Sequence, residues 1–312
     1  GGTVGVTGTA KYGETLTADT TAVVYTPSTG SDSPTYQWKR DGAAILEATS
    51  SSYTLVQEDI GSVITVTVTA DGTHATGSVT SAGTATIAKA DGASTPSAPE
   101  LSSKTTSSIT LTAVTGQEYS MDNGVTWQDS ATFSGLTPNT SYTLVTRVKE
   151  TATHNTSAAS VGATFKTDAL PVIGGTVGVT GTAKYGETLT ADTTAVTYTP
   201  STTSDSPTYQ WKRDGAAILE ATASSYTLVQ ADIGTVITVT VTADGTHATG
   251  SVTSEGEAAI AKADGASAPS APALVSKTTS SITLTAVTGQ EYSIDNGVTW
   301  QDSATFSGLT PN

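Results

Sequence analysis

The segment VITVTVT at residues 63–69 decides the fold class of this chain, because apolar and polar residues alternate along it. From Ile64 onward every second residue is apolar, and each residue between is a threonine. A strand places successive side chains on opposite faces. We therefore predict that Ile64, Val66 and Val68 face a core while the threonines face water.

The sequence around this segment predicts more short strands and no helix. Tyr36 and Trp38 share one face of a predicted strand that ends at the turn formed by Asp41 and Gly42. Short strands separated by turn residues are typical of an all-β sandwich. Further strands are expected at residues 4–7, 14–18, 22–25, 53–55 and 84–88, and one 3₁₀ turn at 57–60.

A second, different all-β pattern follows after residue 99. The turn Asp122-Asn123-Gly124 is predicted to join two strands, because Asn and Gly tolerate positive φ. The expected strands cover residues 109–112, 118–121, 125–127, 142–148 and 163–167.

The whole pattern is duplicated. Residues 1–139 recur at 174–312 without a gap and with twelve differences. Near-identical tandem copies indicate a role defined by repeat number or length. A single catalytic site does not need such an array.

The first half of each repeat resembles a known family. The YQW stretch containing Trp38, followed by Asp59 and Gly61, resembles the bacterial immunoglobulin-like repeats of cell-surface proteins. Trp38 matches the core tryptophan of strand C, and Asp59 and Gly61 match the D-x-G corner before strand F. Both cysteines of the antibody-type domain are missing, and the spacing after Gly61 is one residue longer. The resemblance covers residues 1–90 and 174–263, and it implies a core packed around Trp38.

The second half resembles a fibronectin type III domain. Leu136, Pro138, Thr140 and Tyr142 have the spacing of its tyrosine corner. The resemblance implies that the Tyr142 hydroxyl bonds back to the backbone across the corner. The family's strand-B tryptophan is replaced by Ile109. Residues 119–127 resemble a variant of the domain found in bacterial surface proteins.

These patterns together predict an all-β chain of tandem β-sandwiches, immunoglobulin-like alternating with fibronectin type III-like, arranged as beads on a string. The expected domains are an immunoglobulin-like sandwich at 1–90, a linker at 91–99, a fibronectin type III-like sandwich at 100–168, a linker at 169–173, an immunoglobulin-like repeat at 174–263, a linker at 264–272, and a fibronectin type III-like sandwich at 273–312.

The last domain ends at Asn312, the counterpart of Asn139, and so is expected to be truncated before strands F and G. We expect either that the natural chain continues or that a neighbour completes the domain in trans. The chain starts at Gly1 without Met or a signal peptide, so a fragment or a processed product is expected.

Composition excludes several classes of protein. The net charge is −15, which gives no basic surface for nucleic acid. No apolar run reaches the length of about 18 residues that a membrane-spanning segment needs. The chain has no cysteine, which excludes disulfides, thiolate metal sites and a cysteine nucleophile.

No catalytic, cofactor-binding or metal-binding residue is predicted. The three histidines lie in expected turns or loops without a second ligand at metal spacing. Ca²⁺ is the one cofactor considered, with Asp91, Asp122, Asp264 and Asp295 as candidates. Each of these stands alone in a turn, where Asp is favoured for local hydrogen bonding. The second domain type has two tryptophans, Trp127 and Trp300, which lie near Tyr119 and Tyr292 in the sequence. They could be exposed platforms for sugars, but we favour packing in the core or against the hairpin.

The function expected from these features is structural and not enzymatic. The chain is interpreted as a spacer, stalk or filament-forming region of a large extracellular bacterial surface protein, supporting adhesion or surface-layer assembly. Its expected partners are neighbouring copies or other surface components, with a host protein or glycan as alternatives. The other interpretations are an adhesin module that binds protein or glycan, an accessory region of a secreted polysaccharide-degrading enzyme, and a phage decoration or tail protein. Domains of about 35–40 Å would give four of them a length of about 140 Å.

Overall fold

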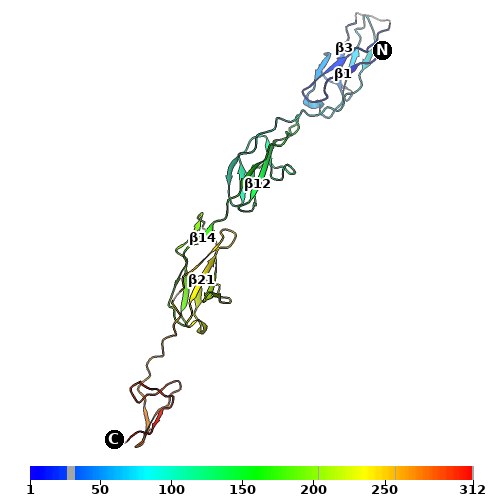
Figure 1. The fold of residues 1–312 in the computed structure, drawn as a ribbon. Coiled ribbons are helices and arrows are strands. Elements are labelled where there is room, and N and C mark those ends of the chain that lie inside the picture. Colours follow the sequence, from blue (N-terminus) through cyan, green and yellow to red (C-terminus); the bar gives the residue numbers. More distant parts are fainter. Residues whose placement is uncertain (27–31, 203, 257, 311–312) are drawn as a thin grey trace. The chain divides into compact units, whose positions relative to one another are not determined.

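The computed structural model describes residues 1–26, 32–202, 204–256 and 258–310 (Figure 1). Within these ranges, helical structure is limited to two 3₁₀ turns, η1 (Gln57–Asp59) and η2 (Gln230–Asp232). The chain divides into two compact units, Gly1–Leu170 and Pro171–Asn312. The predicted fold class, all-β with tandem sandwiches, is confirmed. None of the described helical segments is long and apolar enough to cross a membrane.

The first domain is a sandwich of two antiparallel sheets. One sheet has the order β1-β2-β5 and the other the order β4-β3-β6-β7. The strands are β1 (Gly5–Thr7), β2 (Thr15–Asp19), β3 (Thr35–Arg40), β4 (Ala43–Ala44), β5 (Ser52–Thr54), β6 (Ile64–Thr69) and β7 (Ser78–Thr80).

The core of this domain forms as the alternation predicts. Ile64, Val66 and Val68 of β6 are buried, while the intervening threonines are more exposed. Trp38 is fully buried, and its ring stacks on Tyr53 with 5.9 Å between centroids. Its indole N–H donates to the Ser50 carbonyl at 2.9 Å, so the buried polar atom has a partner.

The Asp59 carboxylate organises the corner between the two sheets. It is fully buried and accepts hydrogen bonds from Arg40 Nε at 2.8 Å, the Tyr53 hydroxyl at 2.9 Å and the Val56 N–H at 2.8 Å. A buried charge is stable only with such partners. Burial, together with the bond to Asp59, raises the pKa of Tyr53 to about 12. The residues of the expected D-x-G corner therefore hold the sandwich together.

Two expected strands of the first domain differ from the structure. Residues 84–88 form no strand, because the Ile87 N–H donates to the Ser62 carbonyl and its own carbonyl accepts from Gly61. These backbone groups thus bind a loop and not a neighbouring strand, although Ile87 is buried in the core. Residues 22–25 make one bridge, between Val23 and Gly2. The sequence pattern did not predict β7.

The second domain has two three-stranded sheets, β11-β9-β8 and β10-β12-β13. Ile109 and Leu144 are fully buried between them, as is nearly all of Tyr119. The Thr137 N–H donates to the Tyr142 hydroxyl at 2.9 Å, which confirms the tyrosine corner. The strands are β8 (Leu101–Lys104), β9 (Ser108–Leu111), β10 (Gln117–Ser120), β11 (Thr132–Ser134), β12 (Ser141–Val148) and β13 (Ala163–Lys166).

The expected return strand at 125–127 does not form. The Asp122 side chain captures the Thr126 N–H at 2.9 Å, which keeps the backbone in a turn until Gln128 bridges to Tyr119.

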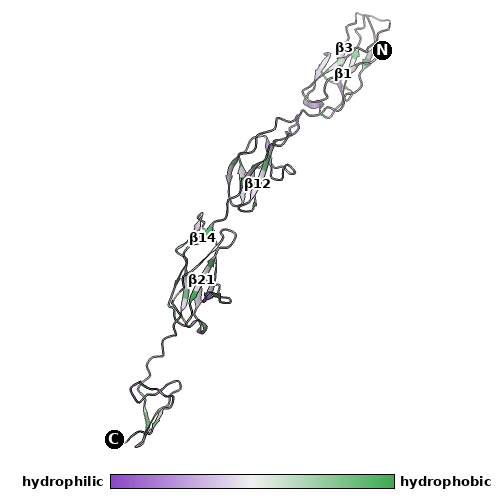
Figure 2. Cartoon of the chain, viewed as in Figure 1, coloured by the Kyte–Doolittle hydropathy of each residue, from purple (hydrophilic) through white to green (hydrophobic). Residues whose placement is uncertain are grey.

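The second unit repeats the strands of the first domain and the strands β8, β9 and β11 of the second domain, and it adds two strands. β14 (Val172–Gly175) pairs antiparallel with β17 (Val196–Thr199). Val172 and Ile173, which were expected in a linker, are the first residues of β14. Hydrophobic residues again lie along the strands, as on β12 and β21 in Figure 2. The other strands are β15 (Gly178–Thr180), β16 (Thr188–Asp192), β18 (Thr208–Arg213), β19 (Ala216–Ala217), β20 (Ser225–Thr227), β21 (Ile237–Thr242), β22 (Ser251–Thr253), β23 (Leu274–Lys277), β24 (Ser281–Leu284) and β25 (Thr305–Ser307).

The last domain is described as far as residue 310. Its sheet has the order β23-β24-β25 around a small core of Tyr292, Ala304 and Phe306. Asn312, on which the expected truncation was based, lies outside the described residues.

Candidate functional site

The histidines of the repeat lie in capped turns. His74 Nδ1 lies 2.6 Å from Asp71 Oδ2, and the same pair recurs between His247 and Asp244. Hydrogen bonds from the backbone and ring of the histidine hold the pKa of Asp71 and Asp244 well below the usual range. The pairs therefore stabilise a loop through local hydrogen bonds.

The four aspartates considered for Ca²⁺ bind groups of the protein itself. Asp91 pairs with Lys11 at 2.8 Å, and Asp264 pairs with Lys184 at 2.7 Å. Asp122 accepts from the Thr126 hydroxyl and N–H, which lowers its pKa to about 2. Asp295 binds its own turn in the same way. Across the described ranges, no three His, Asp or Glu side chains come together as metal ligands would.

The two tryptophans of the second domain type have different surroundings. The Trp127 indole N–H donates to the Gly124 carbonyl at 2.9 Å, and the Arg147 guanidinium lies 4.1 Å from the ring centroid. Trp300 donates in the same way to Gly297, but its side chain is 59% exposed. Tyr119 and Tyr292 are both buried. Trp127 therefore packs on its hairpin under a cation, an arrangement that aromatic faces favour.

Contacts between the first and second domains gather at residues 89–92, and this joint is the candidate functional site. The Lys89 ammonium binds the Glu150 carboxylate and donates to the Thr151 carbonyl at 2.7 Å. The hydrogen bond from Lys89 lowers the pKa of Glu150. The end of the first domain is thus bound to the loop that follows β12.

Backbone hydrogen bonds continue the joint one residue further. The Ala90 N–H donates to the Thr153 carbonyl at 2.9 Å, and the Asn155 N–H donates to the Ala90 carbonyl at 3.0 Å. These bonds form a parallel bridge between Ala90 and His154. The His154 ring meets the edge of Tyr12 with 5.7 Å between centroids. A single bridge therefore binds the chain to the second domain at the point where it leaves the first.

Gly92 lies in close contact with the backbone of the second domain at Thr156 and Ser157. A Cβ at this position would lie 2.1 Å from the Thr156 carbonyl oxygen and 2.7 Å from the Ser157 nitrogen. Only a residue without a side chain fits against this backbone. At the counterpart, Gly265, a Cβ would meet nothing within 4 Å.

The sequence did not identify this joint. The sequence predicts a surface loop at His154, and the composition of residues 91–99 predicts a linker. The contacting residues lie about sixty positions apart, so no local periodicity connects them. The one signal was the glycine between Asp91 and Ala93, which is equally typical of a free linker.

No family model matches the chain, and no curated protein does. The structure titled "Three N-terminal domains of the bacteriophage RB49 Highly Immunogenic Outer Capsid protein (Hoc)" is similar at 16% identity, over 82% of this chain and 98% of that one, with a TM-score of 0.30. The central fibronectin-III array of RIM-binding protein has 14% identity over 82% and 97%, with a TM-score of 0.19. The FN1-FN3 domains of chicken CNTN1 have 11% identity over 83% and 100%, with a TM-score of 0.22.

Proposed function

We propose that this chain is a structural scaffold: a spacer, stalk or filament-forming region of a large extracellular bacterial surface protein, supporting adhesion or surface-layer assembly. It carries out no reaction. Its partners are neighbouring copies of itself or other surface components. Each sandwich sets a fixed spacing, and the number of repeats sets the reach.

The joint at residues 89–92 is the observation that carries this proposal. A scaffold must resist bending where its domains meet. Three contacts lie together at this joint: the bridge between Ala90 and His154, the ion pair of Lys89 with Glu150, and the close approach of Gly92 to Thr156. Together they restrict the rotations that a free linker would allow.

The exposed faces of the sheets support the same role. Threonine hydroxyls bond in pairs across neighbouring strands, as between Thr67 and Thr80 at 2.8 Å and between Thr143 and Thr164 at 2.9 Å. Such cross-strand pairs stabilise a sheet while leaving it polar and uncharged. The net charge of −15 keeps an array of these domains soluble.

Small-angle X-ray scattering of the whole chain tests the proposal. A fixed joint between the first two domains predicts a narrower distribution of dimensions than the same chain shows with a flexible joint. The scaffold proposal would be overturned if the two samples gave the same distribution. A matched sample with residues 91–99 replaced by a Gly-Ser sequence of equal length shows what a flexible joint looks like.

A further inference from the structure

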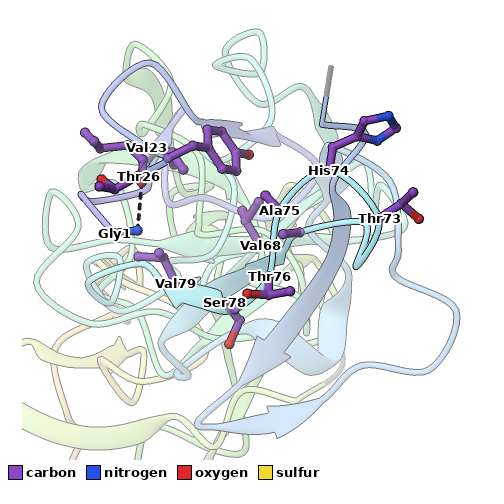
Figure 3. Close-up of a pocket in the computed structure, with 14 residues that line it drawn as sticks. Gly1, Val23, Thr26, Val68, Thr73, His74, Ala75, Thr76, Ser78 and Val79 are labelled. Atoms are coloured by element: carbon purple, nitrogen blue, oxygen red, sulfur yellow. Dashed lines mark hydrogen bonds between the residues drawn. The ribbon is translucent and has the colours of Figure 1, made fainter. Parts of the chain in front are cut away.

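The open groove at one end of the first domain is not a separate site (Figure 3). Its volume is about 460 Å³, and Val23 and Val68 supply part of its apolar lining. In the second repeat, the residues that directly precede Gly174 cover the equivalent surface, where the Ile173 N–H donates to the Thr249 carbonyl at 2.9 Å. The groove therefore belongs to the path of the chain between successive domains.

A tight turn follows β4 in the first sandwich. The Ala48 N–H donates to the Ile45 carbonyl at 3.2 Å, and Glu47 has a φ of 62°. A bond between the first and fourth residues, with a positive φ only at the third, defines a type II turn in which Leu46 is the second residue. The second copy forms the same turn at residues 218–221.

Glutamate at the third position of this turn strains the backbone. Type II turns take glycine or asparagine there, because a positive φ brings the Cβ of other residues too close to the backbone. Glu47 and Glu220, with φ of 62° and 60°, are the only described residues at positive φ that are not glycine, aspartate or asparagine. Glycine would remove this strain, so the turn is not optimised for stability. Backbone strain that the surrounding structure maintains points to a function.

The surrounding structure holds the turn in one conformation. The Gln37 side-chain amide donates to the Ile45 carbonyl at 2.8 Å and to the Trp38 carbonyl at 2.9 Å. The Trp38 N–H donates to the Ala48 carbonyl at 2.9 Å. The turn is thus fastened to β3, whose Trp38 is fully buried in the core. A loop that is fixed in advance loses little conformational freedom when it binds a partner.

The turn exposes an apolar side chain beside a free charge. Leu46 is 90% exposed, as is its copy Leu219, and no large hydrophobic side chain of the described residues is more exposed. The neighbouring Ala43 and Ala44 of β4 are exposed as well. Within the described part of the chain, the exposed Glu47 carboxylate forms no salt bridge. Neither the leucine nor the glutamate therefore contributes to the packing of the domain.

We propose that the turns at residues 45–48 and 218–221 are binding sites for a basic partner protein, whose apolar pocket takes the leucine and whose lysine or arginine pairs with the glutamate. Burial of the leucine supplies affinity, and the ion pair supplies specificity. The net charge of −15 favours a positively charged partner and opposes binding of a second copy. Because the two turns have the same sequence, a partner with two pockets binds with avidity.

Selection of a phage-displayed random peptide library on the whole immobilised chain tests this proposal. The variant that carries both Leu46→Ser and Leu219→Ser is the target for counter-selection. Enriched peptides are expected to combine lysine or arginine with an aromatic or aliphatic residue, and to bind the double variant about tenfold or more weakly. Their affinity should also fall as salt is added, because salt screens an exposed ion pair. No enrichment, or peptides that bind the double variant equally well, would overturn the proposal.

Glycine at the strained position separates binding from folding. Glu47→Gly together with Glu220→Gly removes both carboxylates and relieves the backbone. The melting temperature should therefore rise, while binding of the selected peptides weakens by about tenfold or more. Glu58→Gln, at an exposed carboxylate outside the turn, is the matched control and should change neither quantity. A lower melting temperature or a retained peptide affinity in the glycine variant would contradict the proposed site.

Sedimentation of the whole chain distinguishes a basic partner from a second copy. We expect a monomer over the measured range of concentration. Association that Leu46→Ser and Leu219→Ser abolish would make a second copy the partner and overturn the proposal. This binding role goes beyond the scaffold proposal, since peptide affinity and scattering are measured independently.

Discussion

Replacing Gly92 by alanine should loosen the joint between the first two domains without unfolding either of them. The added Cβ would lie 2.1 Å from the Thr156 carbonyl oxygen, whereas ordinary contacts begin at 3.4 Å. The atom in the way belongs to the backbone, so no side-chain rotation relieves the clash. The segment after Ala90 must therefore move away from residues 153–157.

The cost follows from the bonds that this movement breaks. The two hydrogen bonds of the bridge, Ala90 N–H to Thr153 and Asn155 N–H to Ala90, measure 2.9 and 3.0 Å. Each net hydrogen bond contributes about 0.5–1.5 kcal/mol, so their loss costs about 1–3 kcal/mol. Gly265→Ala is the matched control, because it lies in the same local sequence and its Cβ would meet nothing within 4 Å.

Hydrogen exchange measured by NMR reads out this change directly. Gly92→Ala should speed exchange of the Ala90 and Asn155 amides by about 5- to 150-fold, the equivalent of 1–3 kcal/mol. Exchange in the core strand β6 should stay the same. Unchanged protection of both joint amides in Gly92→Ala, or an equal effect of Gly265→Ala, would refute the assignment of a fixed joint.

Three further outcomes follow from the packing. Ile173→Ala should destabilise the second immunoglobulin-like domain by about 2–5 kcal/mol in urea denaturation. Val172→Ala should cost clearly less, because the Val172 side chain is 53% exposed. Equal losses of stability in the two variants would contradict the burial of Ile173. Asp59→Asn and Asp232→Asn should each lower the stability of their own domain by about 1–3 kcal/mol, because both carboxylates are fully buried with the same partners; a loss in one copy only would refute this. The pKa of Tyr53 is raised from 10.0 to about 12 in the folded state. The protonated Tyr53 hydroxyl therefore stabilises the folded domain fully below pH 10, and this stabilisation is lost as the pH rises through about 12. Melting temperatures between pH 9 and 12 should show this loss, and replacing Tyr53 and its repeat counterpart by phenylalanine should reduce it.

Local sequence patterns were sufficient for the elements whose faces differ in polarity. The alternation in residues 64–69 predicted β6 and its buried face, because that strand has one face in the core and one in water. The spacing up to Tyr142 predicted the corner bond, since that bond spans only five residues.

Local sequence patterns did not predict the contacts between distant backbone segments. Ile87 suggested a strand, but its backbone binds the loop at Gly61 and Ser62, which no periodicity reveals. The joint at His154 and the docking of Ile173 also depend on backbone groups of remote residues. Composition predicts linkers at residues 91–99 and 169–173, but it carries no information on which surface each segment contacts.

¹⁵N relaxation of the whole chain tests most directly whether ordered contacts join the first and second domains. If the joint at residues 89–92 is fixed, amides in β6 and β12 must report one common rotational diffusion tensor. Separate tensors for the two domains, with the shorter correlation times of independent bodies, would contradict the account.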